Sequence, residues 1–163
     1  MPVGGIFNVV LDVGRYQEFL PLCTFSEVDK SSIVIKNDSE GEFKARLSMG
    51  VSSLVTFSYT SAVTYKKYQT IISESVDEEA FKRLHSRWDF RPLTKSRSVI
   101  QYRVQLDFNE KHSSMAARLA FDQVVKSITS AFEKRCGDLH EEVLNEEMAK
   151  HKDNDRENLF VRT

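Results

Sequence analysis

The residue types that most often bind metals or act as bases are few in this sequence and widely spaced. They are His85, His112, His140, His151, Cys23 and Cys136. None of them falls into a short spacing typical of zinc ligands, such as a CxxC pair or an HExxH motif. We therefore expect no metal site. We interpret the histidines as solvent-facing or capping side chains and the cysteines as buried or half-buried thiols.

Asp12 and Tyr16 lie one helical turn apart and form a pair of polar side chains that could act together. Two interpretations stay open for them: a local hydrogen bond that fixes the N-terminal helices, or a polar contact to the headgroup of a bound ligand. The sequence contains no GxSxG, GxGxxG or P-loop motif. Because no nucleophile, base and orienting group occur together, we predict that the protein is not an enzyme.

The composition limits the partners that the chain can have. Its 163 residues suit one domain, with 40% hydrophobic and 29% charged residues and a net charge of -1. This balance argues against a nucleic-acid partner, whose phosphates require a basic face. No apolar run approaches the roughly 18–20 residues that span a bilayer, so any membrane contact must be peripheral. We expect a domain over residues 1–150 and a polar tail over 151–163.

Residues 6–20 predict two short helices in tandem. Apolar side chains recur there at helical spacing on both sides of Gly14. They are Phe7, Val10, Leu11, Tyr16, Phe19 and Leu20. We expect Gly14 to end the first helix and Pro21 to end the second, since proline cannot continue a helix.

Apolar and polar residues alternate in the middle of the chain. The alternating stretches cover residues 43–49, 55–60, 87–91 and 100–108, and turn-like polar clusters separate them. Short strands joined by short connections predict an antiparallel sheet with one apolar face. From about 114 to 149 the apolar residues follow a helical period, and we expect Gly137 to kink or break this helix.

An antiparallel sheet with one apolar face must be covered, and the C-terminal helix has a matching apolar stripe. The predicted fold class is therefore α+β, a curved antiparallel sheet wrapped around a long C-terminal helix in a helix-grip arrangement. The space between sheet and helix is either an apolar cavity or a solid core. Trp88 likewise is either a core residue or a platform for a ligand.

Four stretches of the chain, in order, resemble one known family. They are Phe7-x-x-Val10-x-Asp12-Val13-x-x-Tyr16-x-x-Phe19-Leu20-Pro21-x-Cys23, then Tyr59-Thr60-Ser61-x-Val63, then Phe81-Lys82-x-Leu84-x-x-x-Trp88-x-Phe90-x-Pro92-Leu93, and finally Phe121-Asp122-x-Val124-Val125 with Ala131-Phe132-Glu133-x-Arg135. Over roughly residues 6–140 they are similar to the coenzyme Q-binding proteins of the polyketide cyclase/START-like helix-grip group. The third stretch is similar to a segment that turns from a helix into a strand.

The resemblance implies a protein that binds ubiquinone or its biosynthetic intermediates at the matrix side of the mitochondrial inner membrane. It implies a carrier or chaperone for quinone synthesis and respiratory electron transport, with no catalytic cofactor. Three features depart from the family. We expect no strand before the first helix, because residues 1–5 leave no room for one, and either another chain supplies the strand, or the sequence is truncated, or the strand is absent. Leu22 replaces a common tryptophan, and the loop over residues 50–54 has no proline. The missing strand would leave an exposed sheet edge for another chain, such as a subunit of a respiratory complex.

We expect the ligand to be bound by side chains that point between sheet and helix. They are Leu20, Phe43, Leu47, Phe57, Tyr59, Trp88, Phe90, Tyr102, Val104, Phe121, Val125, Ile128 and Phe132. The expected pocket mouth and membrane contact is formed by Phe19, Pro21, Leu22, Val51 and Leu54. These apolar turn residues either form a mouth or plug the end of the core.

Three other functions remain as alternatives to a free carrier. One is a structural, quinone-binding-like subunit of a larger respiratory assembly. Another is a cyclase-type enzyme of the same fold, which would need an acid/base pair in the pocket. A third, by analogy with bacterial relatives that act on ribosomes, finds little support in the net charge of -1.

Overall fold

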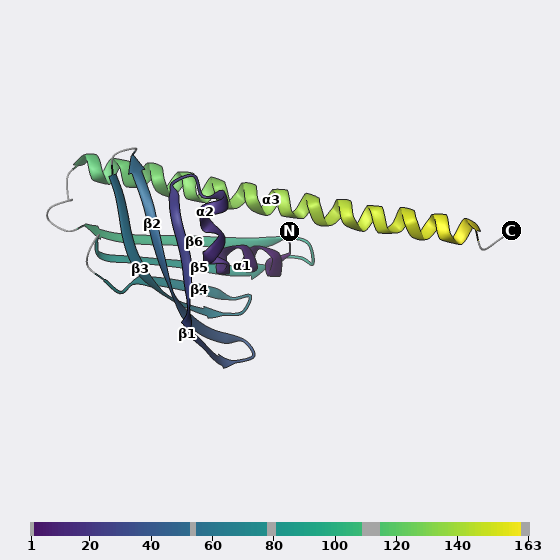
Figure 1. The fold of residues 1–163 in the computed structure, drawn as a ribbon, viewed down its shortest axis with the longest axis horizontal. Coiled ribbons are helices and arrows are strands. Elements are labelled where there is room, and N and C mark those ends of the chain that lie inside the picture. Colours follow the sequence, from purple (N-terminus) through teal and green to yellow (C-terminus); the bar gives the residue numbers. More distant parts are fainter. Residues whose placement is uncertain (1, 53–54, 78–80, 109–114, 161–163) are drawn as a thin grey trace.

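Short helices at the start of the chain lead into a meander of strands, and a single long helix follows (Figure 1). The computed structural model describes the backbone of residues 2–52, 55–77, 81–108 and 115–160, and the side chains of these residues apart from 51, 52, 55, 115–120 and 147–160. The elements are α1 (Val3–Leu11), the 3-10 turn η1 (Val13–Arg15), α2 (Tyr16–Phe19), β1 (Cys23–Asn37), β2 (Glu40–Ser52), β3 (Val55–Lys66), β4 (Thr70–Ser75), β5 (Phe81–Pro92), β6 (Ser98–Phe108) and α3 (Met115–Phe160).

The first N-terminal helix ends earlier than the sequence predicts, and the second ends where expected. Helix α1 stops at Leu11, and Gly14 lies inside the 3-10 turn, so the expectation that Gly14 ends the first helix is wrong. The helix ends because Asp12 leaves the helical region, with φ -79° and ψ 61°. Helix α2 ends at Phe19, two residues before Pro21, as expected.

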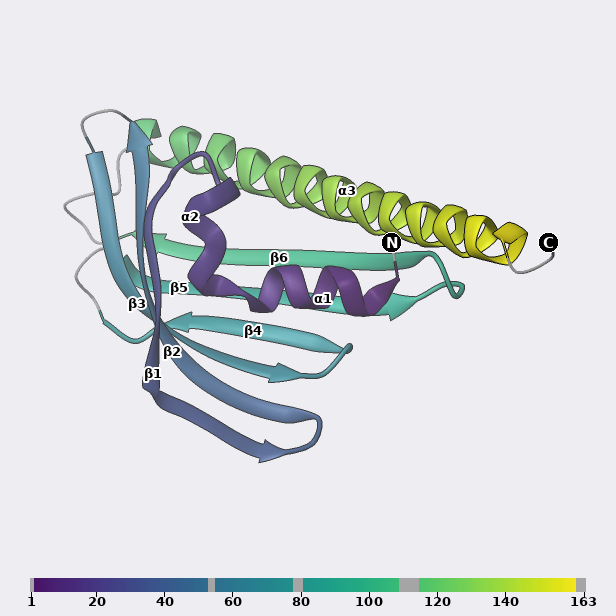
Figure 2. The same ribbon diagram turned by 45° about the vertical axis from the view of Figure 1, so that its right-hand side comes forward.

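The strands form one antiparallel sheet in the order β1-β2-β3-β4-β5-β6. Figure 2 shows the sheet curving so that its concave face encloses α1 and α2, with α3 lying along the open side. The alternating apolar residues therefore form an antiparallel sheet, as expected, and the helix-grip arrangement is confirmed. Among the described residues α1 is the first element, so β1 and β6 are the two edges of the sheet.

The segment over residues 81–93 differs from the expected helix that turns into a strand. Residues Phe81–Pro92 form β5 throughout, paired with β6 from Phe81↔Phe108 to Pro92↔Ser98. This long pairing explains the difference, because every residue from Arg83 to Pro92 pairs with a residue of β6. A bulge between Phe81 and Arg83 keeps Phe81 buried against the concave face.

Helix α3 is continuous over 46 residues, about 70 Å at 1.5 Å per residue. The expected kink or break at Gly137 is therefore wrong. A Cβ at Gly137 would meet nothing within 4 Å, so no neighbouring side chain forces the helix to bend there. The helix also passes the expected boundary at residue 150, and its second half extends beyond the sheet (Figure 1).

The core lies between the concave face of the sheet and the helices. From α1 it contains Phe7 and Val10, each 1% exposed, and from the sheet it contains side chains such as Ala45 and Val63. Phe132 is the α3 residue in this cluster among the side chains that the structure describes. The long helix is thus held to the sheet mainly through one aromatic ring and the half-buried residues around it.

Candidate functional site

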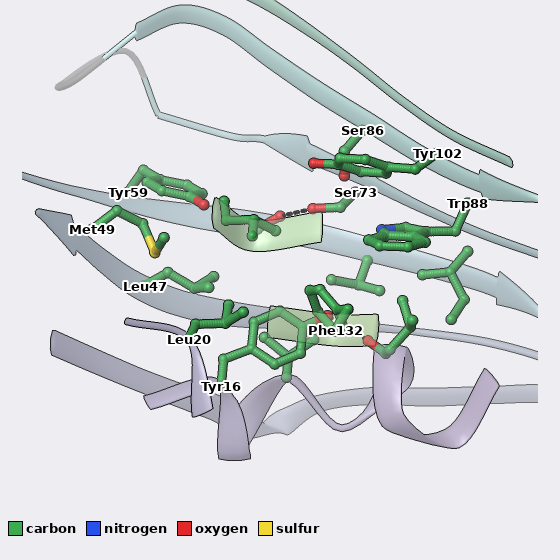
Figure 3. A pocket seen from close by; sticks show the side chains of 16 residues that line it. Tyr16, Leu20, Leu47, Met49, Tyr59, Ser73, Ser86, Trp88, Tyr102 and Phe132 are labelled. Carbon is green, nitrogen blue, oxygen red and sulfur yellow. Dashed lines mark hydrogen bonds between the residues drawn. The ribbon is translucent and has the colours of Figure 1, made fainter. Parts of the chain in front are cut away.

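A cavity lies between the concave face of the sheet and the helices (Figure 3). Its enclosed volume is about 90 Å³. Every part of the helix grip contributes to its wall, from α1 through the strands β2–β6 to α3. The lining residues are Val10, Val13, Tyr16, Leu20, Leu47, Met49, Tyr59, Ser61, Val63, Ile71, Ser73, Ser86, Trp88, Tyr102, Ile128 and Phe132. Of the two interpretations left open by the sequence, a cavity and a solid core, the structure favours the cavity.

Part of the expected ligand-binding set meets at this cavity. Seven of the thirteen expected residues line it: Leu20, Leu47, Tyr59, Trp88, Tyr102, Ile128 and Phe132. Their side chains come from α2, four strands and α3, so only the folded chain brings them together.

The other expected residues lie elsewhere in the grip. Phe43 and Phe90 are buried in the core without reaching the cavity. Phe57 packs on Phe81, with ring centroids 5.4 Å apart, and Phe121 packs on Phe108, with ring centroids 6.2 Å apart. Val104 on β6 and Val125 on α3 are half-buried outside the cavity wall.

Aromatic rings form much of the helix side of the cavity. Phe132 contacts the rings of Tyr16, Phe19 and Trp88, with centroids 5.0–5.2 Å apart in edge-to-face geometry. Trp88 stacks on Tyr102 at 4.1 Å with an interplanar angle of 27°. Trp88 is therefore both a core residue, 8% exposed, and part of the cavity wall.

Three serines in the cavity wall were missed by reasoning from the sequence. Ser61, Ser73 and Ser86 occupy inward-facing positions on β3, β4 and β5. A signal was present: Ser61 stands two residues after Tyr59, and Ser86 two residues before Trp88, so each shares the face of a residue that was expected to point inward. The Ser61 and Ser73 hydroxyls are hydrogen-bonded to each other.

The titratable groups that line the cavity are the three tyrosines. Burial raises the pKa of Tyr16 and of Tyr59 well above the ordinary value, and burial raises the pKa of Tyr102 to about 12. The nearby hydroxyls of Tyr59 and Tyr102 add to the shift in the pKa of Tyr16. All three phenols are therefore neutral at physiological pH, and Tyr59 and Tyr102 offer an O–H donor to the cavity.

Asp12 and Tyr16 do not act as a pair. The Tyr16 hydroxyl donates to the carbonyl oxygen of Val10 at 2.5 Å, and this bond ties α2 to α1. Asp12 lines a separate surface groove between α1 and α3, outside the cavity. The structure therefore supports a local hydrogen bond that fixes the two helices, with Val10 instead of Asp12 as the acceptor.

The histidines and cysteines are not clustered. No group of three or more metal-ligating side chains occurs among the residues that the structure describes. Cys23 is buried and Cys136 half-buried, and neither forms a disulfide. His85 and His140 are half-buried, His112 lies outside the described residues, and the His151 side chain is not described.

The residues expected to form the pocket mouth differ in their burial and in the residues that they contact. Phe19 packs against Tyr16 and Phe132 under α3, and Pro21 is exposed. Leu22 is half-buried, and its carbonyl accepts a hydrogen bond of 2.7 Å from the Gly50 N–H at the end of β2. Leu54 and the Val51 side chain lie outside the described part of the chain.

In the described part of the chain, no helix is both long and apolar enough to cross a membrane. Helix α3 has the length, but charged side chains such as Lys134, Asp138 and Glu142 recur along it.

Comparisons with known proteins agree with this architecture. The family model described as polyketide cyclase / dehydrase and lipid transport matches residues 1–133. A mitochondrial coenzyme Q-binding protein of Dictyostelium discoideum is 26% identical over 140 residues, which are 85% of this chain and 65% of that protein. The ribosome association toxin RatA of Vibrio cholerae is 29% identical over 137 residues, which are 84% of this chain and 89% of the toxin.

A solved structure shows the same fold. A START superfamily protein from Mycobacterium smegmatis superposes with a TM-score of 0.68 at 16% identity, covering 85% of this chain and 91% of that protein. An identity of 16% supports the fold alone, whereas the family model covers most of this chain. The chain therefore belongs to the polyketide cyclase and lipid transport family, with the START-like helix-grip fold.

Proposed function

We propose that this protein binds ubiquinone or one of its biosynthetic intermediates in the cavity and carries it without changing it chemically. In this role it supports quinone biosynthesis and respiratory electron transport at the matrix side of the mitochondrial inner membrane. The similarity to a mitochondrial coenzyme Q-binding protein supports the ligand and the location.

The chemistry of the cavity wall is the observation that carries this proposal. The wall combines apolar side chains with serine and tyrosine hydroxyls and includes no carboxylate, imidazole, ammonium or guanidinium group among the described residues. Such a wall suits a neutral ligand with a few oxygen atoms and a large apolar surface. It lacks the acid/base pair that a cyclase or dehydrase would need, because the phenols of the wall stay protonated.

Binding requires the cavity to expand. A volume of about 90 Å³ is smaller than the roughly 150 Å³ of an engineered cavity that holds benzene, so it is too small for a substituted ring. Helix α3 is the element that can move at the lowest cost, since Phe132 is its one core residue among the described side chains. We infer that the ligand enters as α3 shifts and Phe132 leaves the space between Tyr16 and Trp88.

The carrier must load and unload at a membrane. Each CH₂ exposed to water costs about 0.8 kcal/mol, so a long isoprenoid tail does not cross water freely. We propose that Pro21, Leu22 and the neighbouring end of β2 touch the bilayer, where the turn after α2 meets Gly50.

Extraction of the purified protein tests this function. Organic extraction followed by mass spectrometry is expected to recover a quinone or a prenylated precursor in near-stoichiometric amount. Ser73→Phe places a ring in the cavity and is expected to abolish recovery. Thr64→Phe adds the same ring at an exposed position of β3 and serves as the matched control. Recovery of phospholipid or of no lipid from the wild-type protein would contradict the proposal.

A structural subunit of a respiratory assembly is a second candidate, and the free edge of β6 favours it. Among the described strands, β6 is bonded only to β5, and its inward-facing side chains, such as Val104 and Leu106, are half-exposed. An unpaired edge is a template for a strand from another chain. Native electrophoresis of mitochondrial extracts separates the two roles: a free carrier migrates near 18.8 kDa, and a subunit migrates with its assembly.

Ribosome association is a third candidate, favoured by the similarity to RatA. The charges give it less support. The net charge is -1, and Arg87 and Arg103 on the sheet pair with Asp89 at 2.8 and 3.5 Å. Co-sedimentation with ribosomes in low salt distinguishes this function from quinone transport.

A further inference from the structure

Most of the side-chain hydroxyl groups of the cavity lie on one side of it. Tyr59, Ser61, Ser73, Ser86 and Tyr102 form a band of hydroxyl groups across four neighbouring strands, here called the hydroxyl band. The sheet register brings them together: Val63 pairs with Ser73, Ser73 with Ser86, and Trp88 with Tyr102. Figure 3 shows Tyr59, Ser73, Ser86 and Tyr102 on the sheet side of the cavity.

Part of the hydroxyl band has no side-chain partner among the described residues. Ser61 and Ser73 satisfy each other, but Tyr59, Ser86 and Tyr102 have no side-chain hydrogen bond to any described residue. These three hydroxyls line the cavity and make no hydrogen bond to a described side chain, so a ligand with oxygen acceptors can bond to them there.

The wall of the cavity opposite the hydroxyl band is mainly apolar. Leu20, Ile128 and the Phe132 ring face the hydroxyl band from α2 and α3, and Figure 3 shows Leu20 and Phe132 on the helix side. A flat ring bound between these walls would meet hydrogen-bond donors at its sheet side and mainly apolar atoms at its other face, where the Tyr16 hydroxyl already donates to the Val10 carbonyl.

The two ends of the cavity also differ. At the α1 end the rings of Phe7, Phe90 and Tyr65 close the core, with Phe7 1% and Phe90 3% exposed. At the other end a series of aromatic rings leads away from Tyr59 through Phe81 and Phe108 to Phe121 on α3. Successive centroids in this series are 5.7, 6.2 and 6.2 Å apart.

We propose that the hydroxyl band holds the oxygen-bearing ring of the ligand, and that the apolar tail leaves along Phe81, Phe108 and Phe121. This inference rests on the proposed quinone-carrier function and deepens it by fixing the orientation of the ligand. Carbonyl oxygens of a quinone accept the hydrogen bonds that Tyr59, Ser86 and Tyr102 have to donate. An isoprenoid chain in turn packs against phenylalanine rings with no unmet polar group.

Binding measurements with two probes test the role of the hydroxyl band. One probe is a short-chain ubiquinone, and the other is an alkylbenzene with the same tail and no oxygen on the ring. Tyr59→Phe combined with Tyr102→Phe is expected to weaken quinone binding roughly 10- to 100-fold, the effect of losing two neutral hydrogen bonds. The affinity for the alkylbenzene is expected to stay within about 2-fold of wild type, because no ring oxygen is present to lose a bond.

Tyr65→Phe is the matched control, since Tyr65 lies on β3 but outside the cavity wall. It is expected to leave both affinities unchanged. Equal quinone affinity in the wild type and the Tyr59→Phe/Tyr102→Phe variant would overturn the hydroxyl band while the carrier function stands. Failure of wild-type protein to bind either probe would refute the carrier function itself.

The direction of the tail has a separate readout. A ubiquinone analogue with a photoreactive group at the tail end is expected to label peptides that contain Phe81, Phe108 or Phe121. Labelling of the α1 peptide around Phe7 would reverse the orientation and overturn this part of the proposal.

Discussion

At the scale of single residues, Phe132 belongs both to the core and to the wall of the cavity. Its ring contacts Tyr16, Phe19 and Trp88 and is 5% exposed, although α3 offers few other buried side chains. The same ring therefore stabilises the fold and occupies space that a ligand would need. Because Phe132 has both roles, it couples ligand binding to the attachment of α3 to the sheet.

Replacing Phe132 with alanine is expected to lower the free energy of unfolding by about 3–5 kcal/mol, because it removes a buried ring and leaves a larger cavity. Leu144→Ala, at a position 45% exposed on the same helix, is expected to change it by less than about 0.5 kcal/mol. Urea denaturation measures the free energy of unfolding of both variants. An equal effect of the two variants would mean that Phe132 does not hold α3 to the sheet.

The buried phenols predict a loss of stability at alkaline pH. The pKa of Tyr102 is raised to about 12 in the folded protein, against about 10 in an unfolded chain. A raised folded pKa means that the stabilisation is complete below pH 10 and is lost as the pH rises through about 12. The wild type is expected to unfold in this window, and Tyr102→Phe to lose less stability there.

Across a pH titration, circular dichroism follows unfolding and tyrosinate absorbance follows the ionisation of the phenols. Tyr68→Phe, which removes an exposed phenol, is expected to leave the alkaline transition unchanged. Ionisation of all five tyrosines near pH 10 in a still folded protein would show that the cavity phenols are open to water.

At the scale of elements, the sheet is fixed by long pairings whereas α3 is held at few points. Strands β2 and β3 pair over most of their length, from Glu40↔Lys66 to Ser52↔Val55. Helix α3 runs straight past Gly137 and beyond the sheet, as Figure 1 shows. The sheet is thus the rigid part of the grip and the helix is the part whose position a ligand can change.

Gly137→Ala tests the continuity of α3. Alanine is favoured over glycine in a helix interior by roughly 0.8–1.0 kcal/mol, and no atom lies within 4 Å of the added Cβ. The variant is therefore expected to raise the midpoint of thermal unfolding. The opposite result is expected for Gly41→Ala, whose Cβ would lie 2.5 Å from the Tyr65 hydroxyl. Destabilisation by Gly137→Ala would indicate a bend at this glycine.

At the scale of the whole molecule, the helix grip has two different ends. The β2 end near Leu22 lies at the same end of the sheet as the start of β5 and the end of β6 (Figure 2). Apolar side chains are also exposed on β1, including Ile33 at 48% and Ile35 at 67%. Both surfaces are candidates for contact with a bilayer, and the proposed function selects the first.

Pro21→Glu combined with Leu22→Glu is expected to reduce co-sedimentation with liposomes that contain cardiolipin at least several-fold, because it places two charges at the proposed contact. Ile33→Glu combined with Ile35→Glu adds the same charge on β1 and is expected to have little effect. Leu20 is unsuitable for this test, since it is 4% exposed in the cavity wall and a charge there would disturb folding. Loss of liposome binding in the β1 variant alone would place the membrane contact on β1.

The sequence by itself determined the two N-terminal helices, four of the six strands and the C-terminal helix, and it missed β1 and β4. Alternation over residues 43–49 and 100–108 and the helical period around Phe132 depend on which side chains avoid water, and this local pattern survives in the fold. The apolar members of the cavity wall followed from the same pattern, as Leu47, Trp88 and Ile128 show. The four motif stretches then gave the family.

Only the tertiary structure decided what those elements enclose. Ser73 lies in a stretch where the sequence predicted no strand, and only the pairing of β4 with β3 and β5 brings it beside Ser61 and Ser86 at the cavity. The partner of Tyr16, the straight path of α3 at Gly137 and the strand conformation of Phe81 likewise depend on neighbours distant in the chain. The physical reason is that periodicity along the chain indicates only whether each residue is buried. A binding site depends on which buried residues meet, and these residues are distant in the sequence.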